Sequence, residues 1–192
     1  MLERTPTLGA LLAGTDDWLI VTGLGGAAND VAYLTDFAPR AFTMDGAMGA
    51  ASTVGLGLAL AQPDREVLVV TGDGELLMNV GSLATIALQN PPNFRILVVD
   101  NGRYDLTGGQ QTATATVTDL EAVARGFGIR RTATVRAEAD IPAARQLLQT
   151  RGDTSFVLVK VAPGPAAQVR IDRDGSRLRS RFRAYVLEGE LR

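Results

Sequence analysis

The sequence predicts an α/β fold in which a parallel sheet lies between two layers of helices. Short runs of Val, Leu and Ile alternate with longer segments of helical spacing, which is the pattern of βα units. Three of these runs are almost continuously apolar, as expected of central strands covered on both faces. With 192 residues, 46% of them hydrophobic and 21% charged, the chain has the size and composition of one globular domain.

Strands are predicted wherever a short apolar run has strong β propensity. These runs occupy residues 18–22, 41–44, 66–71, 94–100, 132–135 and 155–161. The third, fourth and sixth of them are the richest in Val, Leu and Ile, so we expect them at the centre of the sheet.

Helices are predicted between these strands, where apolar residues recur at helical spacing. They occupy residues 47–61, 79–89, 118–127 and 141–150. Pro91-Pro92 ends the second helix before the next strand, and Gly126 and Gly128 close the third.

The composition changes after Pro163-Gly164-Pro165, where apolar runs stop and arginine becomes frequent. We therefore expect one ligand-binding domain over residues 1–165 and a C-terminal extension over residues 166–192. Six arginines lie between Arg170 and Arg183, but the formal net charge of the chain is only -2. A solvated face or a contact with another subunit explains this segment better than a nucleic-acid partner does.

Two absent residue types restrict the chemistry. Without cysteine the chain has no disulfide framework, thiolate metal site or cysteine nucleophile. Without histidine, any proton transfer near neutral pH must use a carboxylate, a cofactor or a group on a partner. The N-terminus lacks a signal-peptide pattern and the longest apolar stretch, 54–61, is too short to cross a bilayer, so we expect a cytoplasmic protein without a membrane partner.

The first candidate site is Gly72-Asp73-Gly74-Glu75, which directly follows the strand predicted at 66–71. Glycines around an aspartate allow a sharp turn and a close approach to a ligand, and the helix that follows offers free N–H groups to an anion. A tight turn without a ligand often has the same residues, so this motif alone is weak evidence.

The second candidate site is Asp100-Asn101, at the end of the next strand. Parallel strands have their carboxyl ends at the same edge of a sheet, so Asp73 and Asn101 should lie close together. A carboxylate, an amide oxygen and a backbone carbonyl form the oxygen-only ligand set that Mg²⁺ prefers, with phosphate oxygens and water completing the shell. We therefore predict a metal-bridged diphosphate.

The pairing of Gly72-Asp73-Gly74 with Asp100-Asn101 resembles the thiamine diphosphate motif, which begins with Gly-Asp-Gly and ends with Asn-Asn. The resemblance implies that Asp73, Asn101 and the backbone carbonyl of Arg103 bind Mg²⁺. It also implies that Gly72, Gly74 and Glu75 bind the diphosphate of thiamine diphosphate, and that residues 1–165 form a domain of the diphosphate-binding (PP-domain) fold.

Two further stretches are similar to the same superfamily. Gly46-Ala47-Met48-Gly49 resembles the stretch that precedes the diphosphate motif in its decarboxylases, which implies that Met48 supports the bent cofactor and that the Gly46 carbonyl receives its amino group. Thr107-Gly108-Gly109-Gln110 resembles a run that follows the metal-binding strand. Glu75 and Gln110 are the candidates for facing the substrate. A core position for Met48 and a plain loop for the glycines are the simpler alternatives.

Full-length enzymes of this kind carry a second domain that binds the pyrimidine ring and supplies a catalytic glutamate. The resemblance therefore implies a separate pyrimidine-binding α subunit and a hetero-oligomer such as α2β2. Over residues 19–161 the chain most resembles the diphosphate-binding (β) subunit of the sulfopyruvate and phosphonopyruvate decarboxylases. Their Ser-Lys pair after the first strand is replaced by residues 25–30, which contain no lysine for a sulfonate or phosphonate group.

These residues favour the interpretation that the chain is the diphosphate- and Mg²⁺-binding subunit of a two-chain 2-oxo acid decarboxylase. Three alternatives remain: a carboligase subunit of the acetolactate synthase type, a non-catalytic cofactor-binding module, and a dinucleotide-binding domain based on Gly23-Leu24-Gly25-Gly26. Ala28 occupies the position where the dinucleotide fingerprint needs its third glycine, which makes the last alternative the weakest.

Overall fold

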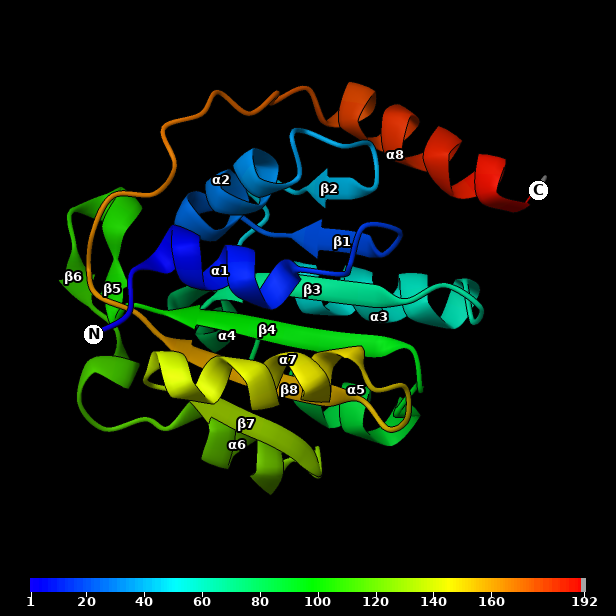
Figure 1. Ribbon diagram of the computed structural model, residues 1–192. Helices are drawn as coiled ribbons and strands as arrows, with labels where there is room; N and C mark the ends of the chain where they lie inside the picture. Colours follow the sequence, from blue (N-terminus) through cyan, green and yellow to red (C-terminus); the bar gives the residue numbers. More distant parts are fainter. Residues whose placement is uncertain (191–192) are drawn as a thin grey trace.

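The computed structural model describes residues 1–190 and contains a six-stranded parallel sheet (Figure 1). The strand order is β2-β1-β3-β4-β8-β7. Each of the six predicted strands is present, with ends that differ by at most one residue from the prediction. The strands are β1 (Leu19–Thr22), β2 (Ala41–Thr43), β3 (Val67–Gly72), β4 (Phe94–Asp100), β7 (Arg131–Val135) and β8 (Ser155–Lys160).

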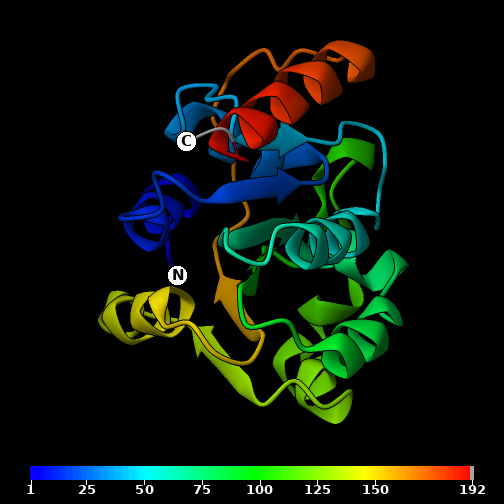
Figure 2. The same cartoon turned by 90° about the vertical axis from the view of Figure 1, so that its right-hand side faces the viewer.

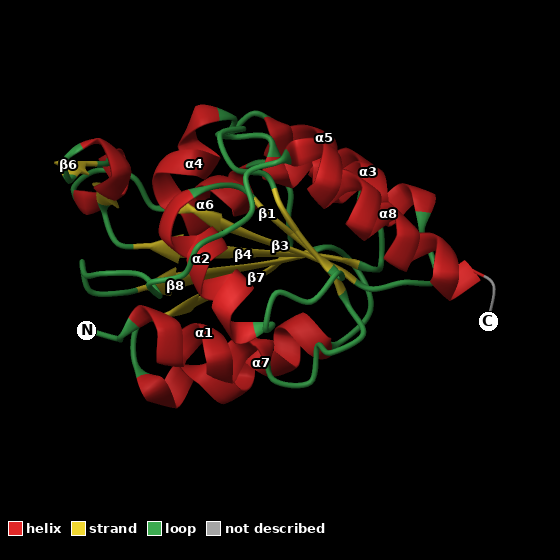
Figure 3. Cartoon of the chain, turned by 90° about the horizontal axis from the view of Figure 1, so that it is seen from above, coloured by secondary structure: helices red, strands yellow, loops and turns green. Residues whose placement is uncertain are grey.

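Helices cover both faces of the sheet, which confirms the predicted three-layer α/β architecture (Figures 2 and 3). One face carries α1 (Arg4–Leu12), α2 (Gly25–Leu34) and α7 (Ile141–Gln149). The other carries α3 (Ala51–Ala61), α4 (Asp73–Met78), α5 (Ser82–Gln89), α6 (Leu120–Gly126) and α8 (Gly175–Glu190). None of the helices within residues 1–190 is both long enough and apolar enough to span a bilayer.

The central strands are buried on both sides because successive side chains point to opposite faces. Leu68 and Val70 of β3 contribute to the core beneath α1, α2 and α7. Val67 and Val69 of the same strand contribute to the core on the other face. The almost continuous apolar runs in the sequence therefore reflect burial from two directions.

Two predicted helices have different bounds in the structure. The helix predicted at 47–61 begins only at Ala51, because Gly46 and Gly49 have φ angles of 86° and 84° and form turns. The helix predicted at 79–89 corresponds to α5, which begins three residues later, at Ser82, and a separate helix, α4, precedes it from Asp73 to Met78. The Nδ2 of Asn79, between them, donates to the carbonyl of Gly49 at 3.0 Å, which fixes this break.

Sequence reasoning missed α1, α2, α4 and α8. The segment 25–30, which the prediction treated as a loop, forms the first turns of α2. Two consecutive glycines at its start have poor helix propensity and concealed it. A small hairpin of β5 (Arg103–Tyr104) and β6 (Gln110–Gln111) follows β4 and was also not predicted.

The segment after residue 165 packs on the chain's own fold. It crosses the edge of the sheet where the strands end and leads to α8, which lies beside β2 (Figure 1). The rings of Phe182 and Phe42 stack with centroids 5.4 Å apart, and Arg177, Arg179 and Arg181 are exposed. A subunit contact through these arginines stays a prediction. The last two residues of the predicted extension lie outside the described residues.

The register between β3 and β4 places the two candidate motifs side by side. Gly72 is paired with Val99, so Asp73, the first residue after β3, lies next to Asp100, the last residue of β4. The edge formed by the carboxyl ends of the strands is therefore the place where the candidate site must lie.

Close packing of α3 on the sheet generates a stability prediction. A β-carbon on Gly55 would overlap Cγ2 of Val69 and lie 3.0 Å from Cε2 of Phe94, whereas one on Gly57 would meet no atom within 4 Å. We expect Gly55→Ala to lower the free energy of unfolding by about 1–3 kcal/mol through overpacking. Gly57→Ala, the matched control in the same helix, should raise it by about 0.5–1 kcal/mol because alanine has the higher helix propensity. Urea denaturation measures both, and equal effects would contradict the packing argument.

Candidate functional site

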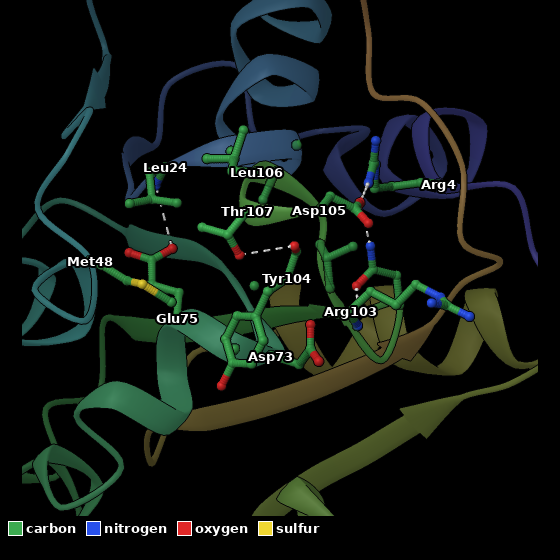
Figure 4. A pocket seen from close by; sticks show the side chains of 17 residues that line it. Arg4, Leu24, Met48, Asp73, Glu75, Arg103, Tyr104, Asp105, Leu106 and Thr107 are labelled. Carbon is green, nitrogen blue, oxygen red and sulfur yellow. Dashed lines mark hydrogen bonds and ion pairs between the residues drawn. The ribbon is translucent and has the colours of Figure 1, made fainter. Parts of the chain in front are cut away.

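A cavity of about 210 Å³ lies at the carboxyl edge of the sheet (Figure 4). Its walls come from the turn after β1, the turn before α3, the start of α4 and the segment after β4. Seven of the predicted site residues line it together: Met48, Gly72, Asp73, Gly74, Glu75, Asn101 and Arg103. Gly46 and Gln110 are not among its lining residues.

Asp73 is the first residue of α4 and its side chain is almost completely buried. Its Oδ2 accepts hydrogen bonds from the hydroxyls of Thr112, at 2.5 Å, and Thr114, at 2.8 Å. Burial raises the pKa of the Asp73 carboxyl, Asp100 adds to the rise, and the two threonines oppose it. A cation near this carboxylate would offset the cost of its burial.

Asp100 lies beside Asp73 and is equally buried. The hydroxyl of Thr114 is 2.8 Å from Oδ1 of Asp100 as well as from Asp73, so it bridges the two carboxylates. Oδ1 also accepts the N–H of Gly102 at 3.0 Å, and Oδ2 forms an ion pair with Lys160. Lys160 thus balances the charge that aspartate brings to a position where the resembling motif has asparagine.

Asn101 and Arg103 form the turn that follows β4. Oδ1 of Asn101 accepts the backbone N–H of Arg103 at 3.0 Å, and its Nδ2 donates to Oδ2 of Asp105 at 2.7 Å. The guanidinium of Arg103 donates to the carbonyl of Gly109 at 2.8 Å, which ties the turn to the β5–β6 hairpin. These bonds hold the amide of Asn101 at the cavity wall.

The two glycines of the motif do not serve the turn that was predicted for them. Gly72 has φ −87° and ψ 160°, and Gly74 does not have a positive φ, so neither needs the conformations reserved for glycine. A β-carbon on Gly74 would overlap the ring of Tyr104, whereas one on Gly72 would meet no atom within 4 Å. Gly74 is therefore required by packing, and Gly72 leaves open space at the cavity wall.

Glu75 is buried on the side of the cavity formed by the turn after β1. Its Oε2 accepts the N–H of Leu24 at 3.4 Å, and a β-carbon on Gly23 would overlap its carboxyl group. Burial raises the pKa of the Glu75 carboxyl. Figure 4 shows Glu75 and Met48 together, opposite Arg4 and Asp105.

Gln110 is exposed, and its amide closes the loop that precedes it. Its Nε2 donates to the carbonyl of Thr107 at 2.7 Å, and its Oε1 accepts the Thr107 hydroxyl at 3.0 Å. Gly108 and Gly109 have positive φ angles of 115° and 75°, which this tight loop requires. Gln110 thus shapes a loop whose residues Asp105, Leu106 and Thr107 line the cavity.

Four residues around the site were not predicted: Arg4, Thr112, Thr114 and Lys160. Arg4 reaches the cavity from α1, whose existence the sequence did not reveal. The two threonines follow a hairpin that the sequence also concealed. Lys160 could have been noticed, because it is the single lysine of the chain and lies near the end of a strand predicted from an apolar run.

Three observations indicate that the cavity can hold the expected metal and diphosphate. Asp73, Asn101 and Arg103, which all line the cavity, carry a carboxylate, an amide oxygen and a backbone carbonyl, which form a hard-oxygen ligand set. Gly72 leaves room for a group close to the backbone. Arg4 offers a buried donor, Nη2, that has no acceptor within residues 1–190.

Comparison with known proteins agrees with this geometry. The family described as "Thiamine pyrophosphate enzyme, C-terminal TPP binding domain" matches residues 25–161. The sulfopyruvate decarboxylase subunit beta of Methanothermobacter thermautotrophicus is 41% identical over 95% of this chain and 94% of its own length. The phosphonopyruvate decarboxylase of Streptomyces hygroscopicus is 39% identical over 96% of this chain and 46% of its own length.

A solved structure shows the same fold. The 2-oxoglutarate:ferredoxin oxidoreductase from Magnetococcus marinus superposes with a TM-score of 0.68 at 20% sequence identity, covering 90% of this chain and 65% of that chain. The predicted diphosphate-binding fold is thereby confirmed.

The threonine bridge between the two carboxylates generates a second prediction. We expect Thr114→Val to lower the free energy of unfolding by about 1–3 kcal/mol, because the carboxylates lose a buried donor without a change in side-chain shape. Urea denaturation without added cofactor measures the effect. Thr116→Val, at an exposed position two residues later, is the matched control and should change stability by less than about 0.5 kcal/mol. Similar losses for both variants would show that the bridge does not stabilise the site.

Proposed function

Since the chain belongs to the thiamine pyrophosphate enzymes, and among them to the decarboxylases of the sulfopyruvate and phosphonopyruvate type, we propose that it binds diphosphate and Mg²⁺ as one subunit of a two-chain 2-oxo acid decarboxylase. The observation that carries this proposal is that Asp73, Asn101 and Arg103 line one cavity at the ends of adjacent strands.

Each residue has a defined part in this proposal. Asp73, Asn101 and the carbonyl of Arg103 would bind Mg²⁺, and the metal would hold the diphosphate. The first N–H groups of α4, at Gly74 and Glu75, have no carbonyl partner within that helix. They would donate to phosphate oxygens, Gly74 in exchange for its present hydrogen bond to the Asp73 carboxyl. Met48 lies across the cavity and would support the bent cofactor, with the Gly46 carbonyl at its amino group.

Bound thiamine diphosphate supplies the carbon that attacks the 2-oxo group and accepts the electrons released as CO₂ leaves. This chain's residues bind and orient that cofactor. Glu75 also lines the cavity, so its carboxyl would be placed to exchange a proton with the substrate. Gln110 acts at most through the loop that it closes, because it does not line the cavity.

A separate pyrimidine-binding α subunit would complete the active site. The relative from Methanothermobacter thermautotrophicus is named as a subunit beta, and a hetero-oligomer such as α2β2 fits that description. The start of α2, residues 25–30, has no lysine, which favours a substrate other than sulfopyruvate or phosphonopyruvate. A cytoplasmic location is part of the same proposal.

Cofactor binding provides the first test. We expect calorimetry to show thiamine diphosphate binding that requires Mg²⁺, and Asp73→Asn to weaken it by about tenfold or more, because a neutral amide is a poorer metal ligand than a carboxylate. The matched control is Asp16→Asn, an exposed position just before β1 at the opposite edge of the sheet. Unchanged affinity in Asp73→Asn would refute the metal assignment.

Catalysis provides the second test. Co-expressed with its α subunit and supplied with a panel of 2-oxo acids, the chain should support CO₂ release, and neither chain alone should do so. Product analysis with an added aldehyde distinguishes the carboligase alternative, which would give a new carbon–carbon bond instead of a free aldehyde. Cofactor binding without turnover of any kind in the assembled complex would favour the non-catalytic module.

A further inference from the structure

Arg4 is the buried cation of the cavity, and the proposed function assigns it no role. Its side chain is 6% exposed and its Nε donates to Oδ2 of Asp30 at 2.6 Å. The guanidinium lies against Gly26, where a β-carbon would come within 2.7 Å of Nη1. Within residues 1–190 the other terminal nitrogen, Nη2, has no acceptor, although it is buried.

The ion pair with Asp30 leaves most of the guanidinium unused. A guanidinium commonly binds a carboxylate through two parallel N–H groups, but here only Nε bonds to Asp30. Arg4 lines the same cavity as Asp73 and Asn101. The unused edge of its guanidinium suits a phosphate, which accepts planar, paired hydrogen bonds from arginine.

The anion now closest to this edge is Asp105. Its Oδ2 is 3.8 Å from Nη1 of Arg4 and accepts a hydrogen bond from Nδ2 of Asn101 at 2.7 Å. One carboxylate oxygen thus lies between Arg4 and a residue proposed to bind the metal–diphosphate. Figure 4 shows this arrangement, with Arg4, Asp105 and Arg103 on the same side of the cavity.

Asp105 lies on a loop that can give up this position. Its side chain is 42% exposed, and it begins the short turn Asp105–Thr107, which the two positive-φ glycines 108 and 109 follow. Leu106, the next residue, is 70% exposed and rests above Gly25. The loop is therefore exposed to solvent at Asp105 and Leu106, although both residues line the cavity.

We propose that Arg4 binds the cofactor's diphosphate and that Asp105 occupies the position of this anion until the diphosphate displaces it. This inference rests on the proposed function and adds two residues to it. The other charged residues that line the cavity are Asp73, Glu75 and Arg103. A diphosphate bound to Mg²⁺ keeps negative charge, so Arg4 attracts it and the Asp105 carboxylate repels it.

Calorimetry with the full chain, and with its α subunit where assembly requires it, tests the proposal. The ligands are thiamine diphosphate with Mg²⁺, inorganic diphosphate with Mg²⁺, and unphosphorylated thiamine. We expect Asp105→Asn to bind both diphosphates about threefold or more tightly than the wild type, because the competing charge is gone. The gain should shrink as salt is added.

The double variant Arg4→Gln/Asp30→Asn removes the cation without leaving Asp30 as an unpaired buried charge. It should bind both diphosphates about tenfold or more weakly, the ratio that a charge-assisted hydrogen bond provides, while thiamine binding stays unchanged. Arg125→Gln, which breaks an exposed pair with Glu121, is the matched control and should bind as the wild type does. If the double variant does not fold, the comparison of Asp105→Asn with the wild type still tests whether the Asp105 carboxylate competes with the diphosphate.

The outcomes separate the two proposals. A wild-type chain that binds no thiamine diphosphate refutes the proposed function itself. If the wild type binds but Asp105→Asn gives no gain, Asp105 does not compete with the diphosphate. If the double variant keeps its diphosphate affinity and instead raises the KM for the 2-oxo acid in the assembled enzyme, Arg4 faces the substrate and our assignment is wrong.

Discussion

Two buried carboxylates at the ends of adjacent strands impose the constraint around which the site is built. The pairing of Gly72 with Val99 places Asp73 and Asp100 next to each other, and both are almost completely buried. Two like charges in such a place are unfavourable unless donors and cations surround them. The Thr114 hydroxyl bridges them and Lys160 pairs with Asp100, which leaves Asp73 as the carboxylate available to a metal.

This constraint also explains the long connection between β4 and α6. The chain leaves the sheet at Asp100, forms the β5–β6 hairpin and returns with Thr112 and Thr114 over the carboxylates. The hairpin presses Tyr104 against Gly74, so the two motifs are locked together by packing as well as by hydrogen bonds. A segment that looks like an irregular loop in the sequence is thus the support of the site.

The sequence could predict the features of the fold and site that depend on the local pattern of apolar and polar residues. Six strands followed from apolar runs, and the meeting of Asp73 with Asn101 followed from the parallel connection between two of them. It could not predict what depends on distant contacts. Helix α1 has no strong periodic pattern and is defined by packing against α2 and α7, so Arg4 remained invisible as a site residue. The roles of Gly72 and Gly74 were misjudged for the same reason, because the ring of Tyr104 comes from another element.

The predicted boundary at residue 165 separates segments that the structure couples through one carboxylate. Asp30 is completely buried; its Oδ1 accepts both the Thr5 hydroxyl and the N–H of Ala167 at 2.8 Å, while Oδ2 holds Arg4. The same side chain therefore fixes the start of α1, α2 and the segment that leads to α8. Because a buried carboxylate needs all of its donors, loosening that segment would alter how Arg4 is held at the cavity wall. The C-terminal extension is in this sense part of the support of the site, although none of its residues up to 190 lines the cavity.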